Sequence, residues 1–307
     1  MKKLVVRNII STLTIVSVSF LILDYAFGRV IGIAESHAKG GDTLNRYYIN
    51  NVSEDSILIM GSSRANHHYI PDSIANALNM SAYNCGIDGN GIILAYSFLN
   101  NIIRRGACPK LIIYDYFPPF DLYENDDRTK ALSHLKPEFD KPGIKEIIDD
   151  IDSDEFIKLH FAAYRYNSIF IQVFSDAVNP RQSVAKGYKA LSGSIQGRFA
   201  RPAKEGLKNI DPVKLKYFRK FLKLADDNNI RIIFVTSPYF HRTDSSQNYH
   251  SLLDSVVDTR SYRYFDFLNN PEFTEQKELF TDPSHMNDSG AKKFTKALID
   301  SIFSRVL

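Results

Sequence analysis

The chain has 307 residues, of which 44% are hydrophobic and 24% are charged, and these are ordinary values for a globular protein. They exclude a disordered chain and a polytopic membrane protein, and the length allows one large domain or two small ones. The net charge of +3 is too small to indicate a nucleic acid as partner, and no Lys/Arg cluster is interleaved with aromatic residues.

The first 34 residues predict a membrane-spanning helix. Two lysines open the chain, and after Arg7 no charged residue occurs until Asp24. A tilted helix over residues 4–23 is long enough to cross a bilayer and lacks a convincing small-x-small cleavage site, so we expect an uncleaved signal anchor. A cleaved signal peptide and a buried core helix are the alternatives. The basic start favours a cytoplasmic N-terminus, with residues 35–307 outside the membrane, in the periplasm of a bacterial cell envelope.

Beyond residue 55, short apolar runs alternate with helical patterns. Strands are predicted at residues 56–61, 80–86, 109–119, 230–238 and 264–268, and helices at residues 71–79, 91–106, 211–229 and 289–307. Such alternation indicates crossover connections and a parallel sheet covered on both faces. We therefore expect an α/β fold, a three-layer α/β/α sandwich with a parallel sheet of about five strands.

Two segments depart from this alternation. Residues 35–55 are polar and contain glycine, which indicates a linker or a short leading helix. Residues 120–210 are rich in charge and aromatic side chains, and Gly and Ser gather near residues 185–206. We interpret residues 120–210 as a mostly helical insertion between the third and fourth strands, with a flexible stretch at its end.

Metal ligands are not indicated at the cysteines or at the paired histidines. Cys85 and Cys108 belong to no C-x-x-C motif or Cys/His cluster, and we read them as two small buried residues, although an oxidising compartment would permit a bridge. The adjacent His67 and His68 point in different directions on any regular element. No Asp, Glu or His lies at ligand spacing from them. We expect neither a metal nor a cofactor.

Polar loops follow the predicted strands at the edge where open parallel sheets bind ligands. They read "GSSRANHHY", "NCGIDGNG" and "YDYFPPFD", and "DPSHMNDSG" follows the last strand. Acyl transfer needs a hydroxyl nucleophile, an imidazole base, an acid that orients the base, and donors for an oxyanion. Ser62 or Ser63 supplies the hydroxyl, and Asp282 and His285 supply the acid and base, three residues apart. The glycines of the second loop permit a backbone amide to approach closely.

These blocks, in this order, resemble the SGNH hydrolase superfamily, the GDSL-type esterases. "GSS" at residues 61–63 is similar to the family's Gly-Asp-Ser, with Ser62 in place of Asp, and "NCGIDG" is similar to its second block. The resemblance implies that Ser63 is the nucleophile and that the amides of Ser63 and Gly89 hold the oxyanion. Asp-x-x-His before the final helix implies that His285 is the base and Asp282 its orienting acid.

The third block of that family, Gly-x-Asn-Asp, is missing, because the third strand ends in "YDYFPPFD". One oxyanion donor is therefore lacking, which typically costs about 2.7–4 kcal/mol of transition-state stabilisation. Arg64, Tyr116, Asn66 and Asn90 are the candidates to replace it.

Further residues at this edge are candidates to contact substrate. Asp115 is expected to bind a sugar hydroxyl or Arg64, and Asn90 and Tyr116 lie in the same loops. His67 is a candidate to line the acyl or sugar pocket, with plain packing as the alternative, and His241 is a candidate to contact the substrate.

The resemblance implies an esterase that removes O-acyl groups, O-acetyl above all, from envelope or extracellular polysaccharide. An O-acetyltransferase with the same acyl-serine step is the first alternative, and proteins of polysaccharide synthesis are then expected partners. A non-catalytic glycan-binding or assembly protein is the alternative of another class. An α/β-hydrolase is disfavoured, because its Gly-x-Ser-x-Gly elbow fails at Ala65.

Overall fold

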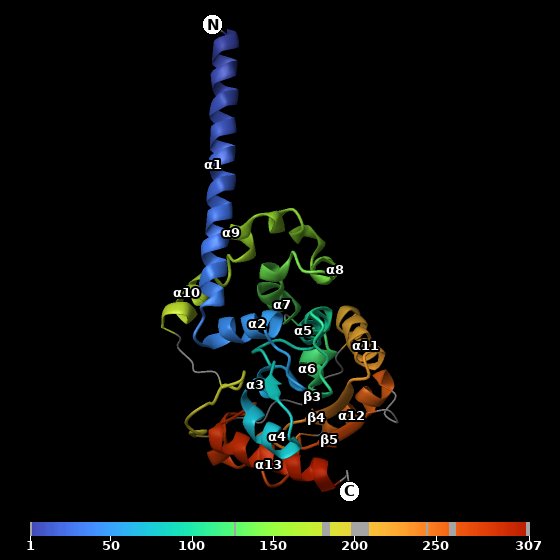
Figure 1. Ribbon diagram of the computed structural model, residues 1–307. Coiled ribbons are helices and arrows are strands. Elements are labelled where there is room, and N and C mark those ends of the chain that lie inside the picture. Colours follow the sequence, from blue (N-terminus) through green and yellow to red (C-terminus); the bar gives the residue numbers. More distant parts are fainter. Residues whose placement is uncertain are drawn as a thin grey trace.

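The central sheet has five parallel strands in the order β2-β1-β3-β4-β5 (Figure 1). The computed structural model describes residues 2–125, 127–179, 185–197, 209–243, 245–257 and 262–304. The strands are β1 Ile57–Gly61, β2 Ala82–Asn84, β3 Leu111–Asp115, β4 Arg231–Thr236 and β5 Arg263–Asp266. All five predicted strands are confirmed. Gly61 pairs with Asp115, and Asp115 with Val235, so the carboxyl ends of the three central strands are level.

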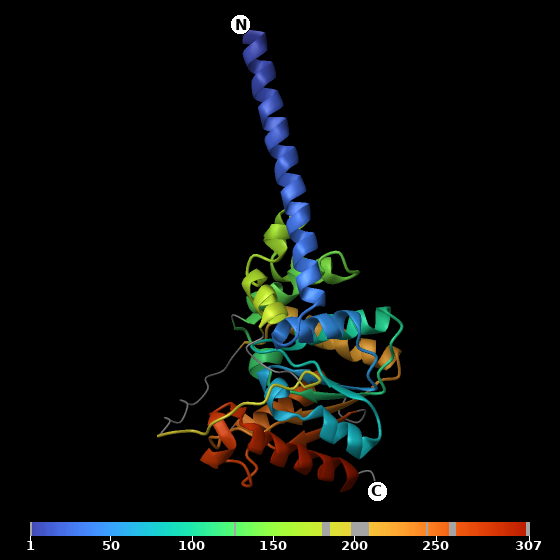
Figure 2. The same cartoon turned by 60° about the vertical axis from the view of Figure 1, so that its left-hand side comes forward.

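Helices cover both faces of the sheet, which confirms the three-layer sandwich (Figure 2). Alternate residues of β1 point to opposite faces, because side chains alternate along a strand. Leu58 and Met60 join one apolar core, and Ile57 and Ile59 join the other. The first core is covered by α2 Gly41–Asn51, α5 Ile92–Arg104 and α11 Pro212–Asp227, and the second by α3 Ser63–His68, α4 Pro71–Leu78 and α13 Asp288–Ser304.

Local sequence explains where α11 begins. The carboxylate of Asp211 accepts hydrogen bonds from the amides of Val213 and Lys214, at 2.9 and 3.3 Å. Pro212 occupies the first helical position, where its missing N–H costs nothing. The helix predicted at residues 211–229 therefore has Asp211 as its N-cap and begins at Pro212.

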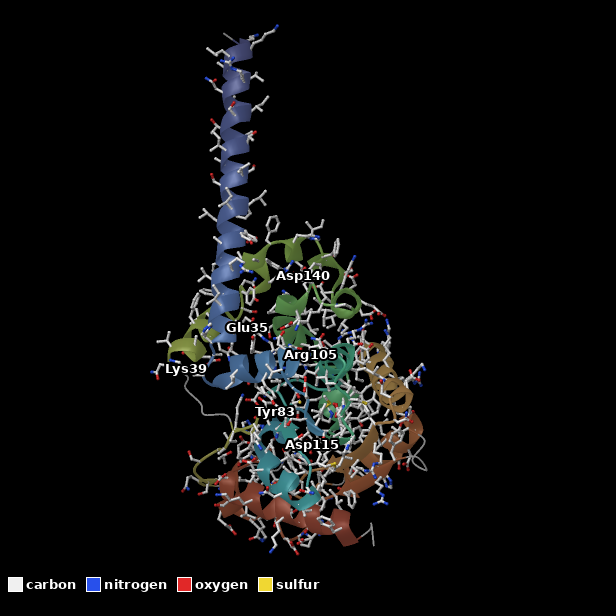
Figure 3. All side chains as sticks on the ribbon, viewed as in Figure 1. Glu35, Lys39, Tyr83, Arg105, Asp115 and Asp140 are labelled. Carbon is white, nitrogen blue, oxygen red and sulfur yellow. The ribbon has the colours of Figure 1, made fainter. Side chains whose placement is uncertain are left out.

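The N-terminal helix α1, Lys2–Ser36, extends away from the body (Figure 1). It is long and apolar enough to cross a membrane, with a mean hydropathy of 1.9 over an 18-residue window, and none of that window is buried. The alternative of a buried core helix is therefore wrong. Its last turns pack on the body, where Glu35 forms a buried ion pair with Arg46 of α2 (Figure 3). Of the two readings of residues 35–55, the structure has the leading helix.

Residues 118–178 form a helical region between β3 and the body end of α1. It comprises α6 Pro118–Asp121, α7 Asp127–Leu135, α8 Ile144–Ile151, α9 Ala162–Arg165 and α10 Phe170–Val178, with short 3-10 helices at Lys136–Glu138, Ser153–Glu155 and Lys158–His160. Residues 185–197 then return to the edge of the sheet, where the amide of Asn84 donates to the carbonyl of Lys186 at 2.9 Å. The rest of the stretch expected to be flexible, residues 198–206, lies outside the described residues.

Several elements were not predicted from the pattern. They are α3, α12 Ser245–Val256, the 3-10 helix Lys277–Leu279 and the antiparallel pair β6 Phe280–Asp282 and β7 His285–Met286. The cysteines are both free: Cys85 is buried, as expected, but Cys108 is exposed, and the expectation of two buried cysteines is wrong for the second. Its position in the connection that leads into β3 leaves it on the surface.

We expect Gly187→Ala to destabilise the fold by about 2 kcal/mol or more. Gly187 has φ +84°, and a Cβ there would lie 1.8 Å from the carbonyl oxygen of Asn84. Gly193→Ala is the matched control, because Gly193 has φ +88° but nothing lies within 4 Å of its added Cβ. In that control only the strain of a left-handed backbone at an alanine should lower the free energy of unfolding, by about 1 kcal/mol. Urea unfolding of both variants measures the difference, and equal losses would contradict the steric argument.

Candidate active site

Ser63 stands at the turn from β1 into α3, as its first helical residue. Gly61 ends β1 with φ +138°, and a Cβ there would lie 2.8 Å from the carbonyl oxygen of Asp115, so only glycine fits this close approach. Ser62 is the N-cap of α3, and its hydroxyl accepts the amide of Arg64 at 3.4 Å. Ser62 and Ser63 thus have different tasks: the first begins the helix, and the second presents its hydroxyl to His285.

Asp282 and His285 are held by the turn between β6 and β7. Oδ1 of Asp282 accepts the amides of Ser284 and His285 at 2.8 and 3.0 Å, which fixes the carboxylate. Its Oδ2 lies 2.8 Å from Nδ1 of His285, and Nε2 of His285 lies 2.7 Å from Oγ of Ser63. A carboxylate beside Nδ1 places the proton there and leaves Nε2 free to accept the proton of the serine. The structure brings together the three residues that the sequence blocks singled out.

The environment keeps Asp282 ionised. Partial burial on its own raises the pKa of this carboxyl, but the hydrogen bond and charge of His285 and the two backbone amides outweigh it and hold the pKa below the usual range. A carboxylate that stays charged can orient the imidazole and stabilise the imidazolium that forms when Ser63 loses its proton. Ser63 itself is only 8% exposed, so its hydroxyl is shielded from bulk water.

The two amides expected to hold an oxyanion have no partner among the described residues. Neither the N–H of Ser63 nor that of Gly89 donates to another group there. Gly89 has φ +69°, a conformation that glycine adopts without strain. Gly86, in the same loop, packs against α3, where an added Cβ would lie 2.5 Å from the amide nitrogen of Asn66. The loop after β2 therefore depends on glycine at both positions.

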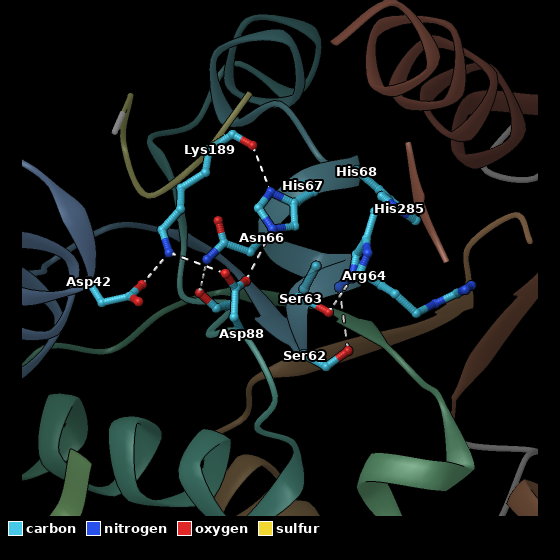
Figure 4. A network of polar contacts seen from close by, with 12 residues as sticks. Asp42, Ser62, Ser63, Arg64, Asn66, His67, His68, Asp88, Lys189 and His285 are labelled. Carbon is cyan, nitrogen blue, oxygen red and sulfur yellow. Dashed lines mark hydrogen bonds and ion pairs between the residues drawn. The ribbon is translucent and has the colours of Figure 1, made fainter. Parts of the chain in front are cut away.

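Arg64 does not replace the missing third-block donor. Its side chain is directed away from the Ser63 hydroxyl (Figure 4), and only 1% of the residue is exposed. The guanidinium donates to the carbonyl of Ser237, lies 3.5 Å from Asp115 Oδ2, and stacks over the ring of Phe117 at 4.6 Å. The expectation that Arg64 completes the oxyanion hole is wrong, because the carboxylate and carbonyl at the ends of β3 and β4 attract it.

The two asparagines are engaged as well. Nδ2 of Asn66 donates to the carbonyl of Gly86 at 2.8 Å, and Nδ2 of Asn90 donates to the carbonyl of Asp88 at 3.0 Å. Both side chains are used to shape the loop after β2. The amides of Ser63 and Gly89 are donors that this site leaves open, and the buried hydroxyl of Tyr116, the remaining candidate, likewise has no hydrogen-bond partner among the described residues.

The residues expected to touch substrate are almost entirely buried. Each is at most 5% exposed: Asn90, Asp115, Tyr116, His67 and His241. Asp115 fulfils the other expectation, the contact with Arg64, and also accepts from Tyr69 Oη at 2.6 Å. Substrate contact by this set stays a prediction, because Ser63 is itself only 8% exposed and burial to this degree does not separate the two cases.

Sequence reasoning missed a charged network around His67 (Figure 4). Nδ1 of His67 lies 2.8 Å from the carbonyl of Lys189, and its Nε2 lies 3.2 Å from Asp88. The ammonium of Lys189 reaches Asp88 at 3.6 Å and also pairs with Asp42 of α2. Burial raises the pKa of Asp88, but the hydrogen bond of His67 and the charge of Lys189 outweigh it and lower that pKa to about 2. No sequence signal marks Lys189, which comes from the segment at residues 185–197.

The network reaches the candidate catalytic base. The rings of His67 and His285 meet edge to face with their centroids 5.5 Å apart. His67 therefore packs against His285 and is itself fixed by Asp88 and Lys189. Because His67 is buried and held in place, its ring supports the ring of His285.

His68 ties α3 to the turn that carries His285. Its Nε2 accepts the amide of Met286 at 3.0 Å, so Nδ1 carries the proton and donates to the hydroxyl of Ser237 at 2.9 Å. Complete burial, and then the charge of Arg64, hold the pKa of His68 well below 6.5. His68 thus stays neutral, with a single tautomer that joins three segments distant in sequence.

We expect His68 to make the stability of the fold depend on pH. The unfolded chain binds a proton at this side chain below about pH 6.5 and the folded chain does not, so the free energy of unfolding falls as the pH drops below that value. In His68→Gln this contribution disappears. The stability difference between wild type and variant should therefore shrink by about 1.4 kcal/mol per pH unit below 6.5 in chemical denaturation. A difference that stays constant from neutral to acidic pH would contradict the neutral, buried state.

Among the described residues, no group of three or more His, Cys, Asp or Glu side chains is arranged to hold a metal ion. The site offers the hydroxyl of Ser63, the imidazole of His285 and the carboxylate of Asp282.

Comparisons with known proteins add likenesses of structure. No protein-family model and no curated protein matches the chain. An assigned acylhydrolase of Bacteroides fragilis is 12% identical, with a TM-score of 0.34, over 80% of this chain and 86% of its own. A GDSL-like lipase of Bacteroides thetaiotaomicron is 11% identical, with a TM-score of 0.38, over 87% and 96%. An assigned lipolytic protein of the G-D-S-L family from Desulfitobacterium hafniense is 9% identical, with a TM-score of 0.39, over 80% and 98%.

Such low scores carry no argument about activity. The resemblance to the SGNH hydrolases rests on the order of the blocks along the sequence. In space, His285 contacts both Ser63 and Asp282.

Proposed function

We propose that the protein is a serine-dependent acyl-ester hydrolase. The observation that supports this most strongly is the continuous chain of contacts from Ser63 Oγ to His285 Nε2 at 2.7 Å and from His285 Nδ1 to Asp282 Oδ2 at 2.8 Å. A nucleophile, a base and an orienting acid within hydrogen-bond reach form the arrangement that activates a hydroxyl for attack on a carbonyl.

In the proposed reaction, Oγ of Ser63 attacks the ester carbonyl carbon while Nε2 of His285 takes the hydroxyl proton. The carbonyl oxygen becomes an oxyanion, and the amides of Ser63 and Gly89 are the proposed donors to it. Collapse breaks the bond to the leaving alcohol, which receives the proton from His285, and leaves an acyl-serine. Water, deprotonated by His285, then attacks the acyl carbon, and Ser63 regains its proton as the carboxylic acid departs.

The proposed substrate is an O-acyl group, O-acetyl above all, on an envelope or extracellular polysaccharide. This part rests on the membrane-compatible helix α1 and its basic start, which favour an anchored protein whose body faces the periplasm. The same acyl-serine serves an O-acetyltransferase if a sugar hydroxyl takes the place of water. Product analysis with an acetyl donor and a glycan acceptor separates the two: free acetate alone identifies a hydrolase, and acetylated glycan identifies a transferase.

A fluorophosphonate probe tests whether the site is catalytic at all. It reacts with an activated serine and leaves a covalent adduct, so we expect labelling at Ser63 in the wild type and none in Ser63→Ala or His285→Ala. Peptide mass analysis locates the adduct, and Ser62→Ala serves as the control that keeps the nucleophile. A folded wild-type protein that is not labelled at Ser63 would favour the non-catalytic glycan-binding or assembly protein instead.

A further inference from the structure

The apolar stretch of α1 ends where the helical insertion meets it. Residues 4–23 number 20, and at 1.5 Å per residue they extend about 30 Å, the thickness of the hydrocarbon core of a bilayer. Their apolar side chains are exposed throughout, for example Leu13 at 61% and Leu23 at 69%. Asp24 is the first acidic residue, and it marks the end of this stretch.

Asp24 is bound by the insertion. Its two carboxylate oxygens accept the amides of Ala162 and Ala163, each at 2.8 Å, at the start of α9. One turn before Asp24, the ring of Phe20 meets that of Phe161 edge to face, with centroids 5.5 Å apart. These contacts place Phe161, Ala162 and Ala163 at the same level along α1 as the end of its apolar stretch.

The helices α1 and α9 pack closely against each other. A Cβ on Gly28 would lie 2.7 Å from Cβ of Ala162, so glycine is what allows α9 to approach the helix. Further along α1, Ile31 packs in a small apolar core with Tyr166, Ile169 and Val173. The insertion and the last turns of α1 therefore form one packed unit, and the level of α9 relative to α1 is fixed.

The stretch of this unit that lies nearest to the N-terminal end of α1 carries an exposed apolar side chain. In both ribbon views the stretch from the 3-10 helix Ser153–Glu155 to α9 is the part of the body nearest to that end (Figures 1 and 2). Ile157 lies in it and is 77% exposed, and Phe161 is partly exposed beside Phe20. Water is an unfavourable surrounding for Ile157, and a lipid surface at this level would cover it.

We propose that residues 156–163 form a collar that contacts the lipid bilayer around α1, with Ile157 in the headgroup boundary. The partner is the membrane itself, chosen because the exposed side chain continues the apolar surface of α1 at the level where a 30 Å span ends. The collar would hold the body at a set orientation to the membrane. The proposal rests on the proposed membrane anchor and is independent of the esterase chemistry.

Depth-dependent fluorescence quenching tests the collar. The full chain, with Cys108→Ser to remove the exposed thiol, is placed in phosphatidylcholine nanodiscs, and an environment-sensitive fluorophore is attached to single cysteines introduced as Leu13→Cys, Ile157→Cys or Lys292→Cys. Lys292 is an exposed residue of α13, and this helix lies at the end of the body opposite to α9 (Figure 1). Nitroxide lipids labelled in the headgroup or deep in the acyl chain are the quenchers.

We expect the deep nitroxide to quench at Leu13, the headgroup nitroxide to quench at Ile157, and neither to quench at Lys292. Quenching at Leu13 without quenching at Ile157 would overturn the collar and leave the anchor intact, and no quenching at Leu13 would overturn both. Asp24→Ala and Gly28→Leu, which loosen α9, should reduce quenching at Ile157 at least twofold. Hydrolysis of a soluble ester should stay unchanged in these two variants, so failure here is distinct from failure of the proposed function.

Discussion

Ser63→Ala is expected to abolish ester hydrolysis, with a loss of about 10⁴-fold or more in kcat. The variant removes the Oγ that lies 2.7 Å from Nε2 of His285, and with it the acyl-serine step. The measurement is turnover of p-nitrophenyl acetate and of an acetylated glycan by wild type and variant. Thermal unfolding verifies that the variant is folded.

Ser62→Ala is the matched control for Ser63→Ala. The two serines are neighbours and both are buried, but Ser62 only caps α3 through the amide of Arg64. Its replacement should cost about 1 kcal/mol of stability and leave turnover within a few-fold of wild type. If Ser62→Ala were inactive and Ser63→Ala active, the assignment of the nucleophile within "GSS" would be wrong. Unchanged turnover in both folded variants would refute the mechanism.

Asp282→Asn is expected to lower kcat by about 10⁴-fold while keeping the fold. Oδ1 accepts the amides of Ser284 and His285, so the carbonyl oxygen of an asparagine would stay in that place. Its NH₂ group would then face Nδ1 of His285, where Oδ2 now lies at 2.8 Å. A donor at this point forces the proton onto Nε2, and His285 could no longer accept the proton of Ser63.

Turnover of p-nitrophenyl acetate by Asp282→Asn and by the wild type measures this loss. The free energy of unfolding at neutral pH should change far less than activity does, since the backbone contacts of residue 282 are retained. An active Asp282→Asn would show that His285 does not need this acid, and the role of Asp282 would be structural.

The orienting pair could be predicted from the sequence because it is local. Asp282 and His285 lie in one tight turn, where the carboxylate caps two amides and reaches the ring of the same segment. The turn at Gly61 is local as well, since a strand that ends on glycine next to a serine cap already implies a sharp change of direction. Apolar runs of strand length and helical spacing likewise indicated the five strands and four of the helices that cover them, α4, α5, α11 and α13.

The direction of Arg64 and the role of the histidine pair could not be predicted. Arg64 is drawn to Ser237 and Asp115, at the ends of two other strands. His67 depends on Lys189, 122 residues further along the chain, and His68 on Met286, 218 residues further along. Partners so distant in sequence leave no local pattern that reveals them.

The sequence by itself therefore determined the α/β sandwich, the serine turn and the Asp-x-x-His turn, because each follows from neighbouring residues and from the period of apolar side chains. Tertiary structure alone decided that Ser63 and His285, 222 residues apart, come within 2.7 Å, and that the side chains expected to touch substrate are buried. The physical reason is packing: which way a side chain points at the edge of a sheet depends on the charges and the space that other segments bring there.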